Sequence, residues 1–144
     1  MTAYADSSVL TSFYAEDVHT PKIQRWLEGR PRLWLTPLHA AEIAHALERQ
    51  VFYRQLSPRE SIAAWADLQA DRGNGIYLLA EVSPAAFARC AELALHYAAR
   101  LNPRTLDSLH VACALELGAR EFWTFDARQA ELARAAGLAI HGAP

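Results

Sequence analysis

Short apolar segments alternate with longer helical patterns along this chain, and the alternation is the strongest constraint on its fold. Leu33–Thr36 and Phe122–Phe125, for example, have the length and apolar character of buried strands. The stretches between such segments repeat their apolar residues with the period of an amphipathic helix. Strands that alternate with helices form a parallel sheet covered by helices on both faces. The sequence therefore predicts a three-layer α/β/α domain with a central, mainly parallel sheet.

Proline, glycine and helix-capping residues set the expected boundaries. Strands are expected over Thr2–Ala5, Leu33–Thr36, Ile76–Val82, Phe122–Phe125 and Leu138–Ile140. Helices are expected after Asp6, from Thr20, from Thr36 to about Gln55, from Ser57 to about Asp71, from Ser83, from Thr105 to Leu117 and over Ala127–Ala136. In the helix from Ser83, an apolar period runs through Phe87, Cys90, Ala94 and Ala98; in the helix from Thr105, the expected buried stripe is Leu106, Leu109, Cys113 and Leu117.

Length and composition favour one domain over residues 1–144. A chain of 144 residues, 52% of them hydrophobic, can bury a core without a disulfide or a structural metal. Cys90 and Cys113 are too few and too far apart in sequence for a zinc site or a disulfide framework. The sequence shows no basic leader and no apolar run of about 18 residues, so we expect a cytoplasmic protein with no membrane segment.

Four carboxylates lie where the expected strands end or the expected helices begin. Asp6 and Asp126 directly follow strands, and the reactive groups of parallel sheets gather at that edge. Glu42 and Asp107 lie on helices, outside the apolar stripes. Carboxylates held together repel one another unless a cation neutralises them, so this set indicates a hard divalent metal. Hydrolysis of a phosphodiester bond is the leading reaction that such a site would perform.

Each acid also has a purely structural interpretation. Asp6 and Asp126 could be helix N-caps, and Asp126 with Gln129 has the spacing of a capping box. Asp107 could complement the dipole of its helix, and Glu42 could be a solvated side chain. For any single acid the structural interpretation is the stronger one. The joint pattern favours a site, because Asp6, Asp107 and Asp126 each lie beside apolar residues, where an unpaired charge is costly.

Other patterns are weaker. The set His39, Glu42 and His45 lacks the i, i+4 histidine pair of a metalloprotease helix. His110 is better explained as a partly buried, hydrogen-bonded histidine than as a ligand or base. No glycine-rich phosphate loop follows a strand, which argues against a P-loop nucleotide hydrolase. A receiver domain would need a lysine late in the chain, and the sole lysine is Lys22.

The net charge of −2 does not exclude a nucleic-acid substrate. If the four candidate ligands are set aside, 12 acids remain against 14 lysines and arginines, so the rest of the surface is slightly basic. Arginine can bind phosphate through two parallel hydrogen bonds. Arg49, Arg104 and Arg128 are therefore candidate contacts for the phosphates of RNA.

Three segments of this chain resemble the PIN-domain family, and in particular the VapC toxins of bacterial toxin–antitoxin pairs. The segments are ADSSVL, RTLDSLHVACAL and FWTFDARQAELARAAGL, and with Glu42 the resemblance extends over essentially the whole chain. It implies Asp6, Glu42, Asp107 and Asp126 as the catalytic, Mg²⁺- or Mn²⁺-binding acids, with Ser8 and Thr124 as residues that orient the ligands. His45 departs from the small polar residue that often follows the helical glutamate in this family.

The resemblance also implies an activity and partners. The expected protein is a metal-dependent endoribonuclease, the toxin of a VapBC-type pair, with an RNA substrate and a VapB-like antitoxin. A homodimer through the long helices is expected as well, because Phe52, Tyr53 and Trp65 exceed what one core needs. Two alternatives stay open: a PIN-like nuclease of RNA maturation or of DNA, and a non-catalytic PIN-like binding module.

Overall fold

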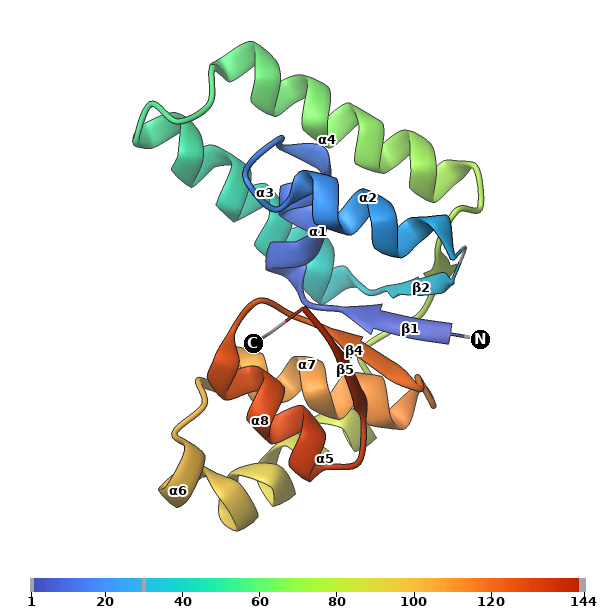
Figure 1. The fold of residues 1–144 in the computed structure, drawn as a ribbon, viewed down its shortest axis with the longest axis vertical. Coiled ribbons are helices and arrows are strands. Elements are labelled where there is room, and N and C mark those ends of the chain that lie inside the picture. Colours follow the sequence, from blue (N-terminus) through green and yellow to red (C-terminus); the bar gives the residue numbers. More distant parts are fainter. Residues whose placement is uncertain (1, 30, 143–144) are drawn as a thin grey trace. The chain divides into compact units, whose positions relative to one another are not determined.

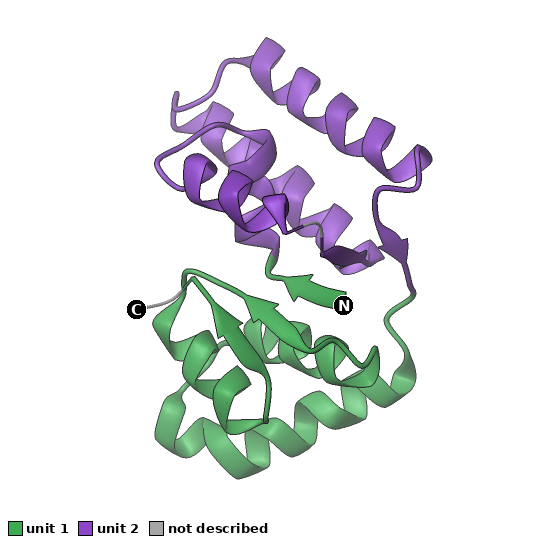
Figure 2. Cartoon of the chain, turned by 45° about the vertical axis from the view of Figure 1, so that its right-hand side comes forward, with its two compact units in different colours: residues 1–6, 81–144 green, residues 7–80 purple. Residues whose placement is uncertain are grey.

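The computed structural model describes residues 2–29 and 31–142, in which helices and strands alternate along the chain (Figure 1). The chain divides into two compact units (Figure 2). Unit 1 consists of residues 1–6 and 81–144, and unit 2 consists of residues 7–80. The first strand thus belongs to the same unit as the segment from residue 81 onward.

Unit 1 is built on three parallel strands. They are β1 (Thr2–Ala5), β4 (Glu121–Trp123) and β5 (Ala139–His141), with β4 paired to both of the others. The helical elements of this unit are α5 (Pro84–Leu93), the π-helical segment η1 (Ala94–Ala98), α6 (Ala99–Leu101), α7 (Thr105–Glu116) and α8 (Ala127–Ala135). The register pairs Ala3 with Glu121 and Ala5 with Trp123.

The helix α7 forms the centre of the core of unit 1. Every residue from 108 to 114 is buried, and four of them are small enough for close packing against a neighbouring helix: Ser108, Ala112, Cys113 and Ala114. On β1, the ring of Tyr4 stacks on Phe122 of β4, with 5.8 Å between the ring centroids. The predicted buried stripe is wrong at its first position, because Leu106 is 47% exposed.

The described residues of unit 2 form two short parallel strands and four helices. The strands are β2 (Arg32–Leu35) and β3 (Leu78–Leu79), and the helices are α1 (Ser7–Tyr14), α2 (Thr20–Glu28), α3 (Pro37–Phe52) and α4 (Pro58–Gly73). Both long helices begin with a capping box and a proline in the first turn. In α3 the box joins Thr36 and His39, so His39 serves the helix start, in line with the rejection of a histidine metal set.

A hydrogen-bonded cluster of two tyrosines and one aspartate connects α1 with the segment that follows α4. The hydroxyl of Tyr14 donates to Asp71 Oδ2 over 2.7 Å and lies 2.6 Å from the hydroxyl of Tyr77. Burial raises the pKa of Tyr77 to about 12, and burial together with Tyr77 and Asp71 raises that of Tyr14. Both hydroxyls therefore stay protonated at neutral pH and can keep donating hydrogen bonds.

The strand expected over Ile76–Val82 is much shorter than predicted. Only Leu78 and Leu79 pair with β2, and the amide of Ala80 still reaches the carbonyl of Leu35. At that point the partner ends, because the next residue of the chain, Thr36, caps α3. A strand can be only as long as the backbone with which it pairs.

Two helices also differ from the expectation. The helix α3 ends at Phe52 and not at Gln55, because Arg54 adopts a left-handed backbone with φ of 57°. The helix from Ser83 changes to a π-helix at Ala94, and its buried side chains are Ala86, Cys90 and Leu93. Phe87, which the apolar period placed on the same face as Cys90, is 58% exposed. The other boundaries, including the end of α4 at Gly73, shift by one or two residues, as helix and strand ends commonly do.

The alternation of parallel strands and helices confirms the predicted α/β/α class. The described strand pairs within each unit are parallel, and in unit 1 the helix α8 packs on β5. In the described ranges, 2–29 and 31–142, no helix has the length and apolar character needed to cross a membrane.

Candidate functional site

The pairing of β1 with β4 positions two of the predicted acids. Asp6 follows β1 directly, is 8% exposed, and donates its backbone N–H to the carbonyl of Trp123 over 2.9 Å. Beyond Trp123 the chain continues through Thr124, which is fully buried, to Asp126. Asp126 is the N-cap of α8 and accepts the backbone N–H of Gln129 at Oδ1 over 2.8 Å. Asp126 thus has the N-cap role that was its structural alternative, and it follows the strand that pairs with the one before Asp6.

Asp107 is held in the first turn of α7 by an arginine. Arg104 Nε donates to Asp107 Oδ2 over 2.9 Å, and the arginine side chain is 77% exposed. Burial raises the pKa of the Asp107 carboxyl, Arg104 opposes that rise, and the charges of Asp6 and Asp126 add to it. The carboxylates of Asp6 and Asp126 are therefore close enough to Asp107 to act on it electrostatically.

A buried histidine lies behind Asp6. His110 is fully buried on α7, and its Nδ1 lies 2.8 Å from the hydroxyl of Tyr4. Its Nε2 lies 3.8 Å from Asp6 Oδ1. The sequence indicated a partly buried, hydrogen-bonded histidine, and the structure shows complete burial. His110 thus lies between the hydroxyl of Tyr4 and the carboxylate of Asp6.

Gln129 contacts the residues that carry all three acids, and the sequence interpretation missed this role. Its backbone N–H donates to the N-cap residue Asp126. Its side-chain Nε2 lies 3.4 Å from Asp6 Oδ1 and 3.2 Å from the carbonyl of Asp107. Thr124, predicted to orient the ligands, donates its hydroxyl to Gln129 Oε1 over 2.6 Å. The spacing of Asp126 and Gln129 is visible in the sequence, but the sequence interpretation explained it by helix capping alone.

The fourth predicted acid, Glu42, lies on α3 in unit 2. Its Oε1 accepts the hydroxyl of Ser7 over 3.0 Å, and Ser7 is buried. Ser7 is the residue after Asp6 in the chain, and the sequence interpretation had singled out its neighbour Ser8, which is exposed. His45, which departs from the family pattern, is exposed, with Nδ1 2.9 Å from the carbonyl of Ala41.

The donor set suits a hard divalent cation, although the carboxylates are not gathered into a closed cage. Within the part of the chain that the structure describes, no three His, Cys, Asp or Glu side chains lie close enough together to hold a metal ion. Carboxylate oxygens are the ligands that Mg²⁺ and Mn²⁺ prefer, and Asp6, Asp107 and Asp126 supply them. Burial and, to a smaller extent, the charges of Asp6 and Asp126 raise the pKa of Asp107, and a bound cation would oppose that rise. A bound ion would have to draw these carboxylates closer together.

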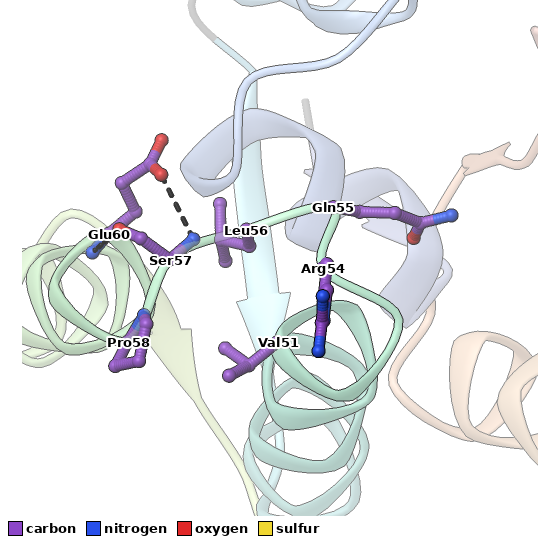
Figure 3. A pocket seen from close by; sticks show the side chains of 7 residues that line it. All are labelled: Val51, Arg54, Gln55, Leu56, Ser57, Pro58 and Glu60. Atoms are coloured by element: carbon purple, nitrogen blue, oxygen red, sulfur yellow. Dashed lines mark hydrogen bonds between the residues drawn. The ribbon is translucent and has the colours of Figure 1, made fainter.

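A separate pocket in unit 2 contains none of the predicted acids. It lies at the connection between α3 and α4 (Figure 3), and it is lined by Val51, Arg54, Gln55, Leu56, Ser57, Pro58 and Glu60. Glu60 there accepts the backbone N–H of Ser57 and closes the capping box of α4. Among the seven lining residues Glu60 is the one acid, and it serves the helix start, so this pocket offers no cluster of acids or bases for catalysis.

Comparisons with known proteins support the fold of this site. A PIN-domain model matches residues 3–135. The structure is similar to Mycobacterium tuberculosis VapC20, a sarcin-ricin loop cleaving toxin, with a TM-score of 0.70 and 18% identity over 95% of this chain and 96% of that one. It is also similar to FitAcB from Neisseria gonorrhoeae, with a TM-score of 0.67 and 14% identity over 98% of this chain and 97% of that one.

A third similar structure is VapBC2 from Rickettsia felis bound to a DNA fragment from their promoter, with a TM-score of 0.66 and 11% identity over 99% of this chain and 98% of that one. A search of curated proteins found no match. At these identities, the likeness to the three structures concerns the fold.

The raised pKa of Asp107 leads to a test by pH-dependent stability. Native Asp107 holds its proton more tightly than an unfolded aspartate, whose ordinary pKa is 3.8. As the pH rises from the unfolded pKa to the higher native pKa, the wild type should therefore lose stability relative to Asp107→Asn. This deficit in stability should then persist to neutral pH. Melting temperatures of both proteins at about pH 3 and about pH 7, without divalent metal, measure this change.

Asp67→Asn, at an exposed position on α4, is the control for a general charge effect. The electrostatic account of the site is contradicted if the advantage of Asp107→Asn over the wild type stays constant or shrinks as the pH rises.

Proposed function

Since this chain belongs to the PIN-domain family, we propose that it is a metal-dependent endoribonuclease and the toxin of a VapBC-type toxin–antitoxin pair, with residues 1–144 as one nuclease domain. The observation that carries the proposal is the convergence of Asp6, Asp107 and Asp126 on Gln129 within unit 1. Asp6 and Asp126 follow parallel strands at their carboxyl ends, and the nearby Asp107, in the first turn of α7, has a raised pKa. Such a combination is typical of a site built for a cation.

In this proposal, Asp6, Asp107 and Asp126 would hold Mg²⁺ or Mn²⁺. When bound, such an ion acidifies water and stabilises the negative charge that develops on the phosphate during hydrolysis. Glu42, whose carboxylate is fixed by the hydroxyl of Ser7, would orient the attacking water or hold a second ion. Ser8 and Thr124 would orient the ligands. The mechanism needs no nucleophilic side chain from the protein.

Arginines would position the RNA backbone. Arg104 uses Nε to contact Asp107, and its exposed guanidinium carries further N–H groups for a phosphate. Arg128, on α8, lies with Nη1 3.5 Å from the carbonyl of Asn102 and is exposed. Arg49 is exposed on α3, two turns beyond Glu42 and on the same side of the helix. These contacts would fix the register of the RNA without selecting its sequence.

The nuclease proposal predicts that the purified protein cleaves RNA only with Mg²⁺ or Mn²⁺ and that EDTA stops the reaction. Asp6→Asn, Asp107→Asn and Asp126→Asn should each lower cleavage by about 100-fold or more, because Asn keeps the shape but loses the charge. Asn is also a good N-cap, so Asp126→Asn should leave α8 intact. Gel assays of RNA cleavage and circular dichroism spectra measure activity and fold.

The exposed Asp67→Asn is the matched control and should keep full activity. Activity that resists EDTA, or full activity in two of the three site variants, would argue against a metal-dependent site. Cleavage of DNA in place of RNA would favour the alternative PIN-like nuclease, since only RNA carries a 2′-hydroxyl.

The toxin role rests on the fold and on the charge of the site. The structures similar to this chain include VapC20, a sarcin-ricin loop cleaving toxin, and VapBC2 bound to a DNA fragment from their promoter. A VapB-like antitoxin with a basic segment would be attracted to clustered carboxylates, because charge-assisted hydrogen bonds are strong where water is excluded. We place such a toxin in the cytoplasm, where its RNA substrates lie.

Growth of bacteria tests the toxin role separately from the chemistry. Expression of the wild-type protein should slow growth, co-expression of the neighbouring short reading frame should restore it, and Asp6→Asn should be harmless without any partner. If the wild type leaves growth unchanged while the purified protein cleaves RNA, the toxin role is wrong and the nuclease role survives.

Exposed apolar side chains on the two long helices of unit 2 support the homodimer. Phe52 and Tyr53 at the end of α3 are 78% and 63% exposed, Ile62 on α4 is 69% exposed, and Trp65 is partly exposed. Burial of these side chains in a second copy would remove apolar area from water. Light scattering should give the mass of a dimer at micromolar concentration and that of a monomer for Phe52→Asp. A monomeric wild type would contradict the proposal.

A further inference from the structure

Gln129 lies at the point where the three acid-bearing segments of unit 1 meet. It is in the first turn of α8, and only 1% of the residue is exposed. Its backbone N–H donates to Asp126 over 2.8 Å. Its side-chain amide donates to Asp6 Oδ1 over 3.4 Å and to the backbone carbonyl of Asp107 over 3.2 Å. One residue therefore links the end of β1, the start of α7 and the start of α8.

The side chain of Gln129 is available for these contacts because a threonine takes over its usual capping duty. In a capping box, the residue three positions after the N-cap returns its side chain to the backbone N–H of the N-cap. Here the backbone N–H of Asp126 donates instead to Thr124 Oγ1 over 3.0 Å. The carboxamide of Gln129 is thus directed toward Asp6 and Asp107.

Thr124 also determines which way the carboxamide points. Its hydroxyl accepts the N–H of Asp126, so its own proton is donated to Gln129 Oε1 over 2.6 Å. The oxygen of the amide is occupied on that side, and the NH₂ group faces a carboxylate and a carbonyl, which can only accept. The hydrogen-bonding partners fit one of the two amide orientations.

A neutral donor suits this position better than a charged one. A buried lysine or arginine would neutralise Asp6 and compete with a cation, whereas a glutamate would add a fourth negative charge to a crowded site. An amide supports a carboxylate oxygen and leaves its charge available. In this respect the amide differs from the charged Arg104, whose largely exposed side chain contacts Asp107.

We infer that Gln129, oriented by Thr124, is a positioning residue that keeps Asp6 and the start of α7 beside the start of α8, so that a divalent cation can draw the three carboxylates together. The inference rests on the proposed metal-dependent function. Residues that orient metal ligands typically change metal affinity by about 10-fold to 100-fold when they are altered. Affinity for the metal alone is therefore the direct readout.

Titration of the full-length protein with Mn²⁺, followed by calorimetry and by the electron paramagnetic resonance of free Mn²⁺, tests the inference. Gln129→Met keeps the length of the side chain but removes the donor, and it should weaken Mn²⁺ binding by about 10-fold or more. Thr124→Val should weaken binding to a similar extent, and Thr124→Ser, which restores the hydroxyl, should recover most of it. The double variant Gln129→Met with Thr124→Val should bind Mn²⁺ no more weakly than the weaker single variant. Both changes break the same chain of hydrogen bonds from Thr124 through Gln129 to Asp6.

Gln24→Met, at an exposed position on α2, is the matched control and should bind Mn²⁺ like the wild type. Kinetics of RNA cleavage at saturating Mn²⁺ supply a second readout, in which the variants should recover much of the lost kcat. If Gln129→Met fails to fold, the pair Thr124→Val and Thr124→Ser decides the question. Wild-type affinity in Gln129→Met or Thr124→Val overturns the inference alone. Absence of Mn²⁺ binding in the wild type overturns the metal-dependent function and this inference with it.

Discussion

The pairing of β1 with β4 is the interaction on which the candidate site depends. Ala5 lies opposite Trp123, and the next residue, Asp6, donates its backbone N–H to the carbonyl of Trp123 over 2.9 Å. Because the strands are parallel, their carboxyl ends meet at one edge, and residues from opposite ends of the chain become neighbours there. A slip of one residue would reverse the face to which each side chain points. The register of this pair therefore sets the approach of Asp6 to Thr124 and to the start of α8.

The site carries an electrostatic cost that the rest of unit 1 only partly offsets. Burial and the charges of Asp6 and Asp126 raise the pKa of Asp107, and Arg104 opposes that rise from a largely exposed position, where ion pairs are weak. Gln129 adds hydrogen bonds but no positive charge. A fold that accepts such a cost commonly does so for function, since stability and a strained or charged site are in conflict. The remaining negative charge is what makes the arrangement suited to a cation.

Features that depend on the local residue pattern, such as strand ends, could be predicted from the sequence. Features that depend on contacts with distant residues, such as the length of β3, could not. Asp6 and Asp126 were predicted at strand ends because a strand followed by a polar residue is a local signal. The length of β3 was wrong because it depends on where β2 ends, which no pattern within Ile76–Val82 records. Gln129 was assigned to a capping box, since its diversion toward Asp6 requires contacts between residues 123 positions apart. Thr124, two residues before the N-cap, was the local indication that a hydroxyl could accept the backbone N–H of Asp126 in place of Gln129.

The central claim is that Asp6, Asp107 and Asp126 together bind a divalent cation. Anomalous diffraction from crystals soaked in Mn²⁺, recorded near the manganese absorption edge, tests it most directly. The account predicts an anomalous peak bounded by these three carboxylates, with Gln129 still donating to Asp6. The distance from that peak to Glu42 would then show whether this acid contacts the ion or only the water. The account is contradicted if no peak lies among the three carboxylates at a Mn²⁺ concentration that supports RNA cleavage, or if the ion binds elsewhere.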